Sequence, residues 1–372
     1  MTKVVKIGGF PQNTNGCSHS QDISVNPVYI GGNYPIAVQT MWKEPLHLSD
    51  LDDIAKKIET LGIIGCNLLR FAVPDIQTAE ILGALAEMVS IPLVADIHFD
   101  YKIAVRCMDF KIAKIRINPG NIGNKDKVRI VLEKAGKNNI PIRIGVNAGS
   151  LPVDLAGKDM SSSEALVQAA QREMLFFKEF GFNDFLVSMK ASTIADTINA
   201  NRILSQRTDA PLHIGVTEAG PLTAGIVRNT AAIITLLTEG IGDTIRVSLS
   251  DTMENEIIAA REIIAAAFQL APENKRFQNR GVNIISCPKC GRCSFDTHCF
   301  TKRWMNELYA LNKDITVAIM GCEVNGPAEA KHSDLGITGA GNKVLVFRHG
   351  RIIRTISASE ADAVFKEELN KL

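Results

Sequence analysis

The chain has 372 residues, of which 41 are basic and 40 acidic, and its formal net charge is +1. This length suffices for a large core and a second, smaller domain, and the balanced charge excludes a general electrostatic attraction to nucleic acid or to a membrane. No apolar run reaches the roughly 18 residues of a membrane span, and the first residues lack the apolar core of a signal peptide.

Residues 1–34 are polar and contain several glycines and asparagines, so we expect a loosely ordered lead-in. We interpret Cys17, which lies in this segment, as incidental.

Residues 35–270 alternate short apolar segments rich in Val and Ile with stretches of helical length. Segments this apolar are typical of strands buried on both faces, as in a parallel sheet covered by helices. We therefore predict an α/β fold with a closed (β/α)8 barrel of the TIM type. An open doubly wound sheet is the alternative, but no Gly-x-Gly-x-x-Gly turn follows the first strand. The expected strands are PIAVQT, CNLLRFAV, PLVADIHF, AKIRINP, PIRIGVNA, DFLVSMKA, PLHIGVTEA and DTIRVSLS.

Two helices of this region are well marked. Ser49 can cap the first, with Asp52 at capping-box spacing, and Gly62 is expected to end it. A second helix is predicted from Asn255 to Leu270.

Polar side chains gather at the carboxyl ends of the expected strands. In a barrel these ends meet at one mouth, where active sites are built from several strands. Five cations converging there would repel one another strongly unless an anion or carboxylates balanced them, and only Asp96 and Glu218 are obvious balancing acids. Because guanidinium forks match phosphate oxygens, we favour a pocket for a polyanion such as a diphosphate over structural ion pairs. The strand-end residues are Gln39, Arg70, Asp96, His98, Arg116, Asn118, Arg143, Asn147, Ser188, Lys190, Glu218, Arg246 and Ser248.

The pattern changes after the barrel region. Residues 271–281 are polar and contain proline, which indicates a linker. Residues 282–372 are predicted to form a smaller α+β domain. Its expected elements are strands at VNIIS, ITVAIM, KVLVF and RIIRTI, a helix near residues 302–311, and a final helix from Ser359 or Glu360.

Three cysteines of this domain indicate a metal centre. Cys287 and Cys290 are two residues apart, a spacing at which both sulfurs can bind one centre, and Cys322 would add a third thiolate. The spacing suits zinc, with Cys293, His298 and Cys299 as further ligands, and it also suits an iron–sulfur cluster. Reduced cysteines buried in the core are the third interpretation. Eight cysteines without an export signal indicate a reducing cytoplasm.

Taken together, these segments resemble the 4-hydroxy-3-methylbut-2-enyl diphosphate synthases, iron–sulfur enzymes of the non-mevalonate isoprenoid route. The resemblance covers residues from about 35 to 340. It implies a TIM-type barrel followed by a smaller α+β iron–sulfur domain that resembles part of sulfite reductase, without the inserted domain of the longer plant-type enzymes. The matching segments are PIAVQTM, LVADIHFDYKIA, RINPGNIGN, IPIRIGVNAGSL, MKAS, TEAG, EGIGDTIRVSL, CPKC and GCEVNGPAEA.

The resemblance also implies an activity: two-electron reductive ring opening and dehydroxylation of 2-C-methyl-D-erythritol 2,4-cyclodiphosphate at a [4Fe–4S] cluster with an open iron. Asp96, Asn147 and Glu218 would act near the chemistry, with Glu218 as candidate proton donor. The implied cluster ligands are Cys287, Cys290, Cys322 and Glu329, and the implied diphosphate-binding residues are Arg70, Arg116, Arg143, Lys190 and Ser248, to which the strand-end pattern adds His98, Asn118 and Arg246.

The chain departs from the family pattern near the expected cluster. Ala328 stands where glycine is usual, Glu323 where an apolar residue is usual, and Cys293 and Cys299 are extra thiols.

The electron donor is expected to be flavodoxin or ferredoxin, because no flavin or nicotinamide motif is visible, and the resemblance implies a homodimer. Two alternatives stay open: a zinc-stapled barrel enzyme with non-redox phosphate or pterin chemistry, and a zinc-ribbon module that binds nucleic acid. The second needs a basic surface with interleaved aromatic residues, whereas this chain has balanced charge and 6% aromatic residues.

Overall fold

A computed structural model describes residues 1–9, 25–152, 154–155, 160–277, 281–288, 290–311, 313–324, 326–328 and 330–372. The chain divides into two compact units, Met1–Gln278 and Asn279–Leu372. Cys17 and Glu329, both singled out from the sequence, lie outside the described residues.

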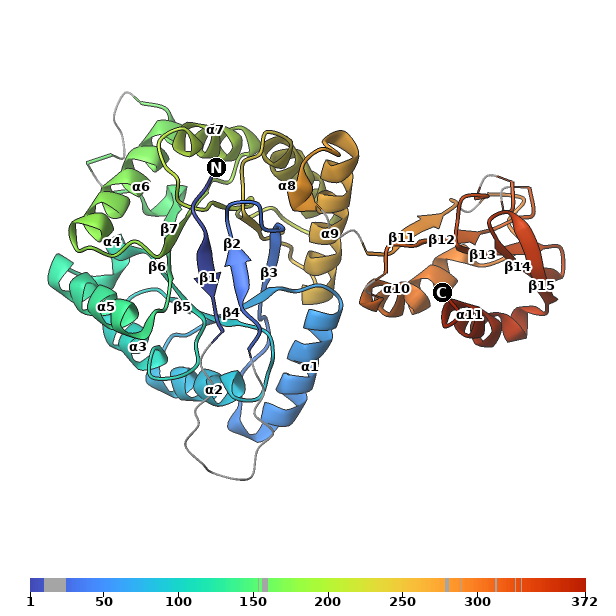
Figure 1. Cartoon of the computed structure of the whole chain (residues 1–372), viewed down its shortest axis with the longest axis horizontal. Helices are drawn as coiled ribbons and strands as arrows, with labels where there is room; N and C mark the ends of the chain where they lie inside the picture. Colours follow the sequence, from blue (N-terminus) through green and yellow to red (C-terminus); the bar gives the residue numbers. More distant parts are fainter. Residues whose placement is uncertain are drawn as a thin grey trace. The chain divides into compact units, whose positions relative to one another are not determined.

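The first unit is a parallel barrel, as the sequence predicted, and each of the eight expected segments contains a strand (Figure 1). The strands are joined in the order β8-β7-β6-β5-β4-β3-β10-β9, and a parallel bridge from Val187 of β8 to Leu212, just before β9, closes the ring. Each strand is shorter than its expected segment, and β9 and β10 are the shortest of these strands, with two residues each. Regular pairing of β9 ends at Gly215, whose φ of 153° few other residues adopt. The strand bounds are β3 Ala37–Met41, β4 Leu68–Ala72, β5 Leu93–Ile97, β6 Lys114–Ile117, β7 Ile142–Asn147, β8 Phe185–Lys190, β9 His213–Ile214 and β10 Thr244–Ile245.

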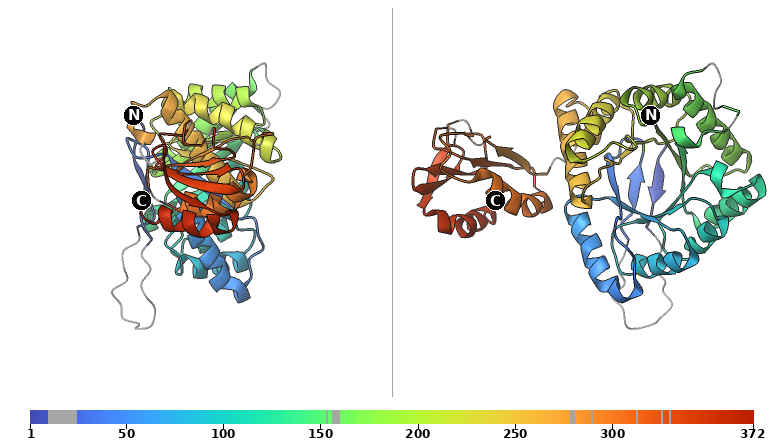
Figure 2. Two further views of the ribbon diagram at one scale, coloured as in Figure 1. Left: turned by 90° about the vertical axis from the view of Figure 1, so that its right-hand side faces the viewer. Right: turned by 180° about the vertical axis from the view of Figure 1, so that it is seen from behind.

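A helix follows each strand and packs on the outside of the barrel (Figures 1 and 2). The last of these helices contacts the first, so that the outer layer is closed as well. The helix bounds are α1 Leu51–Ile63, α2 Ile76–Ala86, α3 Tyr101–Cys107, α4 Pro119–Ile122, α5 Lys125–Asn138, α6 Ser162–Glu179, α7 Ile194–Ser205, α8 Leu222–Thr238 and α9 Met253–Leu270.

The expected cap of the first helix is wrong. Ser49 lies in a 3-10 turn, Leu48–Asp50, where its hydroxyl donates to the Asp50 carboxylate at 2.6 Å, and no side chain caps α1. The helix also continues one residue beyond Gly62 and ends at Ile63. At α9, Thr252 accepts from the backbone N–H of Asn255, so this helix begins two residues before the expected start.

A short antiparallel hairpin covers the amino-terminal end of the barrel. It joins β1, Val5–Ile7, to β2, Val28–Ile30, and its buried side chains pack against residues at the starts of the barrel strands, including Leu68, Val94 and Leu186. The lead-in expected over residues 1–34 therefore contains two strands. Each has only three residues, and β1 alternates buried and exposed positions whereas β2 does not, so neither gives a pattern long enough to identify a strand from sequence.

The second unit is a five-stranded sheet with two helices. Strands β11, β12 and β13 are parallel, and β13, β14 and β15 are antiparallel, in the order β11-β12-β13-β14-β15. Its core contains Phe300 and Trp304 from α10 and Phe365 from α11. The bounds are β11 Asn283–Ser286, α10 Thr297–Ala310, β12 Thr316–Met320, β13 Leu335–Ala340, β14 Lys343–Arg348, β15 Arg351–Ile356 and α11 Ala361–Leu369.

The sequence did not predict β13. Its segment, LGITGA, contains two glycines, which are uncommon in strands. The glycine at 336 is required by packing, because a β-carbon there would lie 2.0 Å from the Phe347 ring.

Part of the expected linker packs on the barrel unit. Lys275–Phe277 forms a 3-10 turn, the Phe277 ring is buried, and Arg276 forms an ion pair of 2.9 Å with Asp243. None of the helices in the described part of the chain has the length and apolar composition needed to span a membrane.

Candidate active site and metal-binding segment

A buried carboxylate, Asp96 at the end of β5, organises one side of the barrel mouth. The Arg116 guanidinium lies 3.0 Å from one of its oxygens, and Arg70 Nε and His98 Nε2 lie 3.5 and 3.3 Å from the other. Burial by itself raises the pKa of Asp96, but Arg70, the His98 hydrogen bond and Arg116 outweigh burial and hold it well below the usual range. Asp96 is therefore ionised and fixes two of the predicted cations.

The neighbouring strand leaves room for this arrangement. Gly145 lies on β7, and a β-carbon there would be 2.5 Å from Nε of Arg116. A side chain at this position would displace the guanidinium.

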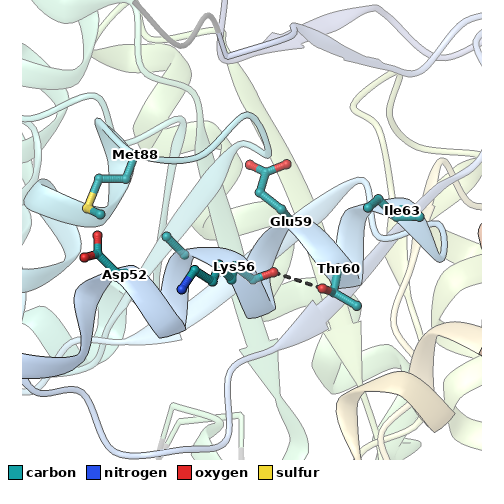
Figure 3. A pocket seen from close by; sticks show the side chains of 7 residues that line it. Asp52, Lys56, Glu59, Thr60, Ile63 and Met88 are labelled. Carbon is teal, nitrogen blue, oxygen red and sulfur yellow. Dashed lines mark hydrogen bonds between the residues drawn. The ribbon is translucent and has the colours of Figure 1, made fainter. Parts of the chain in front are cut away.

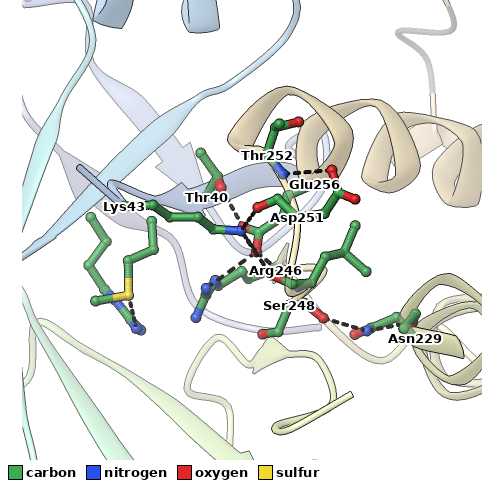
Figure 4. Close-up of polar contacts among 12 residues, drawn as sticks. Thr40, Lys43, Asn229, Arg246, Ser248, Asp251, Thr252 and Glu256 are labelled. Carbon is green, nitrogen blue, oxygen red and sulfur yellow. Dashed lines mark hydrogen bonds and ion pairs between the residues drawn. The ribbon is translucent and has the colours of Figure 1, made fainter. Parts of the chain in front are cut away.

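Glu256 of α9 organises the part of the mouth at β3 and β10, and sequence reasoning missed it. Its wholly buried carboxylate accepts hydrogen bonds from the Thr40 hydroxyl at 2.5 Å and the Leu249 N–H at 2.9 Å. It also forms ion pairs with Lys43 at 2.8 Å and Arg246 at 3.5 Å (Figure 4). A signal existed, since Glu256 falls on the apolar stripe of its helix together with Met253 and Ile257.

Glu218 does not play the balancing role considered from sequence. It is exposed after β9, and its carboxylate accepts from the Ser192 hydroxyl at 3.2 Å. No ion pair links it to Arg246 or Lys190 in the part of the chain that the structure describes. Its backbone φ of 52° lies in the left-handed region, which is rare for glutamate.

Two further predicted cations lack carboxylate partners. Arg143 is 1% exposed, and two of its guanidinium nitrogens have no hydrogen-bond partner among the described residues. Lys190 is also buried at the end of β8, and no described carboxylate lies within ion-pair distance of it or of Arg143. Burial, and then the neighbouring cations, hold the pKa of each well below its ordinary value. The mouth therefore has an excess of positive charge.

The structure adds a cation that the strand-end pattern missed. Lys114, at the start of β6, is completely buried, and its Nζ donates to Gln39 Oε1 at 3.4 Å. It stands two residues before Arg116 and so faces the same side of the strand, which was the available signal.

Of the predicted site residues, Asn147 is the last residue of β7, and His98 and Asn118 directly follow β5 and β6, whereas Arg143 is the second residue of β7 and does not lie at its carboxyl end. Asn118 is buried and Asn147 half-buried, and His98 is largely exposed. The Ser248 side chain is half-buried, while its carbonyl accepts from Asn229 Nδ2 at 3.5 Å (Figure 4).

A shallow groove on the outer helical layer is a less suitable anion site. It lies along α1 and is lined by Asp52, Lys56, Glu59 and Met88, among others (Figure 3). Its acids outnumber its cations, and Glu59 already accepts from the backbone and side chain of Ser90.

The second unit places two predicted ligands side by side. Cys287 follows β11 and Cys322 follows β12, and these strands are parallel neighbours. Between them, the Gly321 N–H donates to the Cys287 sulfur at 3.0 Å. A β-carbon at Gly321 would lie 3.4 Å from this sulfur and 2.6 Å from that of Cys293. Cys293 therefore lies beside Cys287, whereas Cys290 is exposed.

These thiols fit a thiolate-bound centre in their donor chemistry. Cys287, Cys290 and Cys322 form no disulfide among the described residues, and a glycine leaves space at the adjacent strand ends. Among the described residues, no three His, Cys, Asp or Glu side chains converge as one metal ion requires. The described residues therefore assemble neither the zinc set, in which Cys293, His298 and Cys299 would add to Cys287 and Cys290, nor the three cysteines Cys287, Cys290 and Cys322 around one ion.

Comparison with known proteins agrees with this division into two units. The family model described as the GcpE TIM-barrel domain matches residues 20–261, and that of the GcpE protein C-terminal domain matches residues 283–371. The chain is 49% identical to the 4-hydroxy-3-methylbut-2-en-1-yl diphosphate synthase (flavodoxin) of Treponema pallidum, over 94% of this chain and 89% of that protein. Proteins of the same name from Treponema denticola and Thermodesulfovibrio yellowstonii are 47% and 44% identical, each over 94% of this chain and over 96% and 97% of their own lengths.

Proposed function

The chain belongs to the GcpE family, and on this premise we propose that it is an iron–sulfur oxidoreductase that reduces 2-C-methyl-D-erythritol 2,4-cyclodiphosphate to 4-hydroxy-3-methylbut-2-enyl diphosphate. The reaction takes up two electrons and two protons, opens the cyclic diphosphate and releases water. The observation that carries the proposal is the family match over both units, together with buried cations that lack carboxylate partners at the barrel mouth.

Arg143 and Lys190 are assigned to the diphosphate. Ring opening frees a phosphate oxygen, and cations already fixed in a dry site stabilise that developing charge without reorganising. Both side chains are buried without a carboxylate partner in the described part of the chain, and two Arg143 nitrogens have no hydrogen-bond partner there, which supports this assignment. Ser248, Asn118 and His98 are proposed to complete the binding site.

Asp96 is proposed to keep Arg70 and Arg116 in orientations that suit phosphate oxygens, because it holds both guanidinium groups. Arg246 receives the same support from Glu256. Glu218 is proposed as proton donor, since its carboxylate is exposed on the loop after β9. Asn147 is assigned to the reacting end of the substrate.

We assign a [4Fe–4S] cluster to Cys287, Cys290, Cys322 and Glu329. The position of Cys287 and Cys322 just after the neighbouring parallel strands β11 and β12 supports the first and third of these ligands. When bound, such a cluster supplies electrons and a Lewis-acidic iron. Carboxylate is a harder ligand for iron than thiolate, so Glu329 is the proposed ligand of the iron that opens to substrate.

Flavodoxin is proposed as electron donor, because it appears in the names of the relatives, with ferredoxin as the alternative. We further propose a homodimer, which the family resemblance implies, and a location in the cytoplasm.

Anaerobic purification followed by metal analysis tests the proposal. We expect a brown protein that contains iron and sulfide and that consumes the cyclodiphosphate with dithionite and a viologen dye as reductant. A colourless protein with stoichiometric zinc and no reductive turnover would overturn it and favour the zinc-stapled barrel.

A further inference from the structure

Lys114 is a charged residue type in a completely buried position of the barrel. Its Nζ has a single partner, the neutral Gln39 side chain, at 3.4 Å. No carboxylate of the described residues lies within ion-pair distance of it. The nearby positive charges of Arg143 and Arg70 disfavour a positive charge on Lys114.

Three acids of the barrel unit are buried in the described part of the chain, and one of them, Asp243, pairs with Arg276 at 2.9 Å. Asp96 is shared by Arg70 and Arg116, and Glu256 is shared by Arg246 and Lys43. Three cations, Lys114, Arg143 and Lys190, are left without a carboxylate among the described residues. The charged and titratable groups of the interior are Arg70 on β4, Asp96 on β5, Lys114 and Arg116 on β6, Arg143 on β7, Lys190 on β8, His213 on β9 and Arg246 on β10, with Glu256 from α9, whereas β3 provides the neutral Gln39.

Three unbalanced charges in a dry interior repel one another strongly. A guanidinium cannot lose its proton in a protein, whereas a buried ammonium can. Arg143 therefore stays charged, and the repulsion is relieved if one of the two lysines, Lys114 or Lys190, loses its proton. Lys190 is the last residue of β8 and lies at the mouth, whereas Lys114 is the first residue of β6 and lies deeper. Burial, and then the charges of Arg143 and Arg70, keep the pKa of Lys114 well below its ordinary value.

We propose that Lys114 is an uncharged amine in the free enzyme and takes up one proton from solvent when a diphosphate binds at the barrel mouth. The inference rests on the proposed function, because it takes the mouth as the diphosphate site. The added negative charge offsets the repulsion from Arg143 and Arg70, so the ammonium form of Lys114 becomes favourable. Lys114 acts through these neighbours and Gln39, and is a positioning residue.

The direction of the pH dependence follows from linkage. A group that is protonated more readily in the complex makes binding weaker as pH rises. Proton uptake is largest between the pKa of Lys114 in the free enzyme and its pKa in the complex, and it disappears at lower pH, where Lys114 is already charged.

Calorimetry of the full-length, cluster-loaded protein with inorganic pyrophosphate tests this. Titration near neutral pH in buffers of different ionisation enthalpy gives the number of protons taken up per bound pyrophosphate. We expect the wild type to take up about one proton more than Lys114→Met. Protons that pyrophosphate itself gains or loses are the same for both proteins, so they do not contribute to this difference. Lys102→Met, at an exposed lysine of α3, and His213→Gln should both behave as wild type.

Three results would overturn the inference. The first is equal proton uptake in wild type and Lys114→Met, and the second is loss of the uptake in His213→Gln instead. If Lys114→Met does not fold, Lys114→Gln, which keeps a hydrogen-bonding amide, gives the same comparison. The third overturning result is that the wild type does not bind pyrophosphate, which would overturn the proposed anion site as well. Binding of pyrophosphate without the difference in proton uptake would overturn only the role of Lys114.

Discussion

At the scale of single residues, two buried carboxylates organise the barrel mouth. Asp96 holds Arg70 and Arg116, and Glu256 holds Arg246 and Lys43. Each is almost completely buried, so its ion pairs are poorly screened by solvent. The cations that remain unpaired are the ones available to an anionic ligand.

Glu256→Gln should therefore destabilise the barrel. The substitution removes the negative charge that pairs with Lys43 and Arg246 and accepts from the Leu249 N–H. Breaking a buried ion pair costs about 3–5 kcal/mol. The free energy of unfolding from chemical denaturation measures this loss. Glu254→Gln, on the same helix but less buried, should change stability by no more than about 0.5 kcal/mol. Equal effects of the two substitutions would mean that the network around Glu256 does not stabilise the fold.

Arg143→Met and Lys190→Met should each raise the KM for the cyclodiphosphate and leave the iron content unchanged. A lost charge-assisted contact costs about 1.5–3 kcal/mol, which corresponds to roughly a 10- to 100-fold weaker interaction. Steady-state kinetics with the viologen assay provides the measurement, and Arg129→Met, at an exposed position of α5, is the control. An unchanged KM in both variants would mean that these residues support the fold and do not bind the substrate.

Glu329→Cys separates a catalytic cluster from a structural one. Thiolate suits iron–sulfur chemistry better than carboxylate, so the variant should retain its iron. It should turn over at least about tenfold more slowly, because the substrate would have to compete with a stronger ligand. Iron content and reductive turnover are compared in wild type, Glu329→Cys and Glu329→Ala, of which the last should lose iron. Normal turnover in Glu329→Cys would direct attention to Glu323.

At the scale of elements, both candidate sites lie at the carboxyl ends of parallel strands. The hairpin of β1 and β2 packs against the opposite end of the barrel, at the starts of its strands. In the second unit, β11 and β12 end side by side and bring Cys287 next to the turn that contains Gly321 and Cys322. Glycine at 321 allows the sulfurs of Cys287 and Cys293 to approach the backbone closely.

Gly321→Ala should therefore reduce cluster assembly. Its β-carbon would lie 2.6 Å from the Cys293 sulfur and 3.4 Å from that of Cys287. Gly291→Ala is the matched control, because a β-carbon there meets nothing within 4 Å. Iron and sulfide per chain after anaerobic purification should fall in the first variant only.

The double variant Gly321→Ala/Cys293→Ala should recover its iron, since the closest contact is removed. Cys293→Ala alone should keep full iron. If Cys293→Ala loses its iron while Cys322→Ala retains it, the compact set Cys287–Cys290–Cys293 holds the centre instead.

At the scale of the whole molecule, the chain consists of two units with separate cores. The barrel core lies between the strands and their outer helices, and the core of the second unit is built on Phe300, Trp304 and Phe365. The second unit is small, and metal binding contributes directly to the stability of such domains.

Removal of the metal should thus unfold the second unit and spare the barrel. Cys287→Ala, Cys290→Ala and Cys322→Ala should each lose the cluster, as should wild type treated with a chelator under oxidising conditions. Calorimetry should then show the transition of the second unit at a lower temperature and an unchanged transition for the barrel. A single transition that shifts as a whole would show that the two units unfold together.

The sequence by itself determined the eight parallel strands, the change of domain type after the barrel and the three candidate cysteine ligands. Hydrophobic periodicity and motif spacing are local properties, and they carry this information directly. The sequence did not identify the hairpin of β1 and β2 or strand β13, because short strands and glycine-rich strands lack a clear pattern. Only the tertiary structure decided that Glu256, not Glu218, pairs with Arg246, that Lys114 lies beside Gln39, and that Cys293 lies beside Cys287. Such pairings join residues far apart in the chain or on different elements, and they depend on how the strands register and how the helices pack.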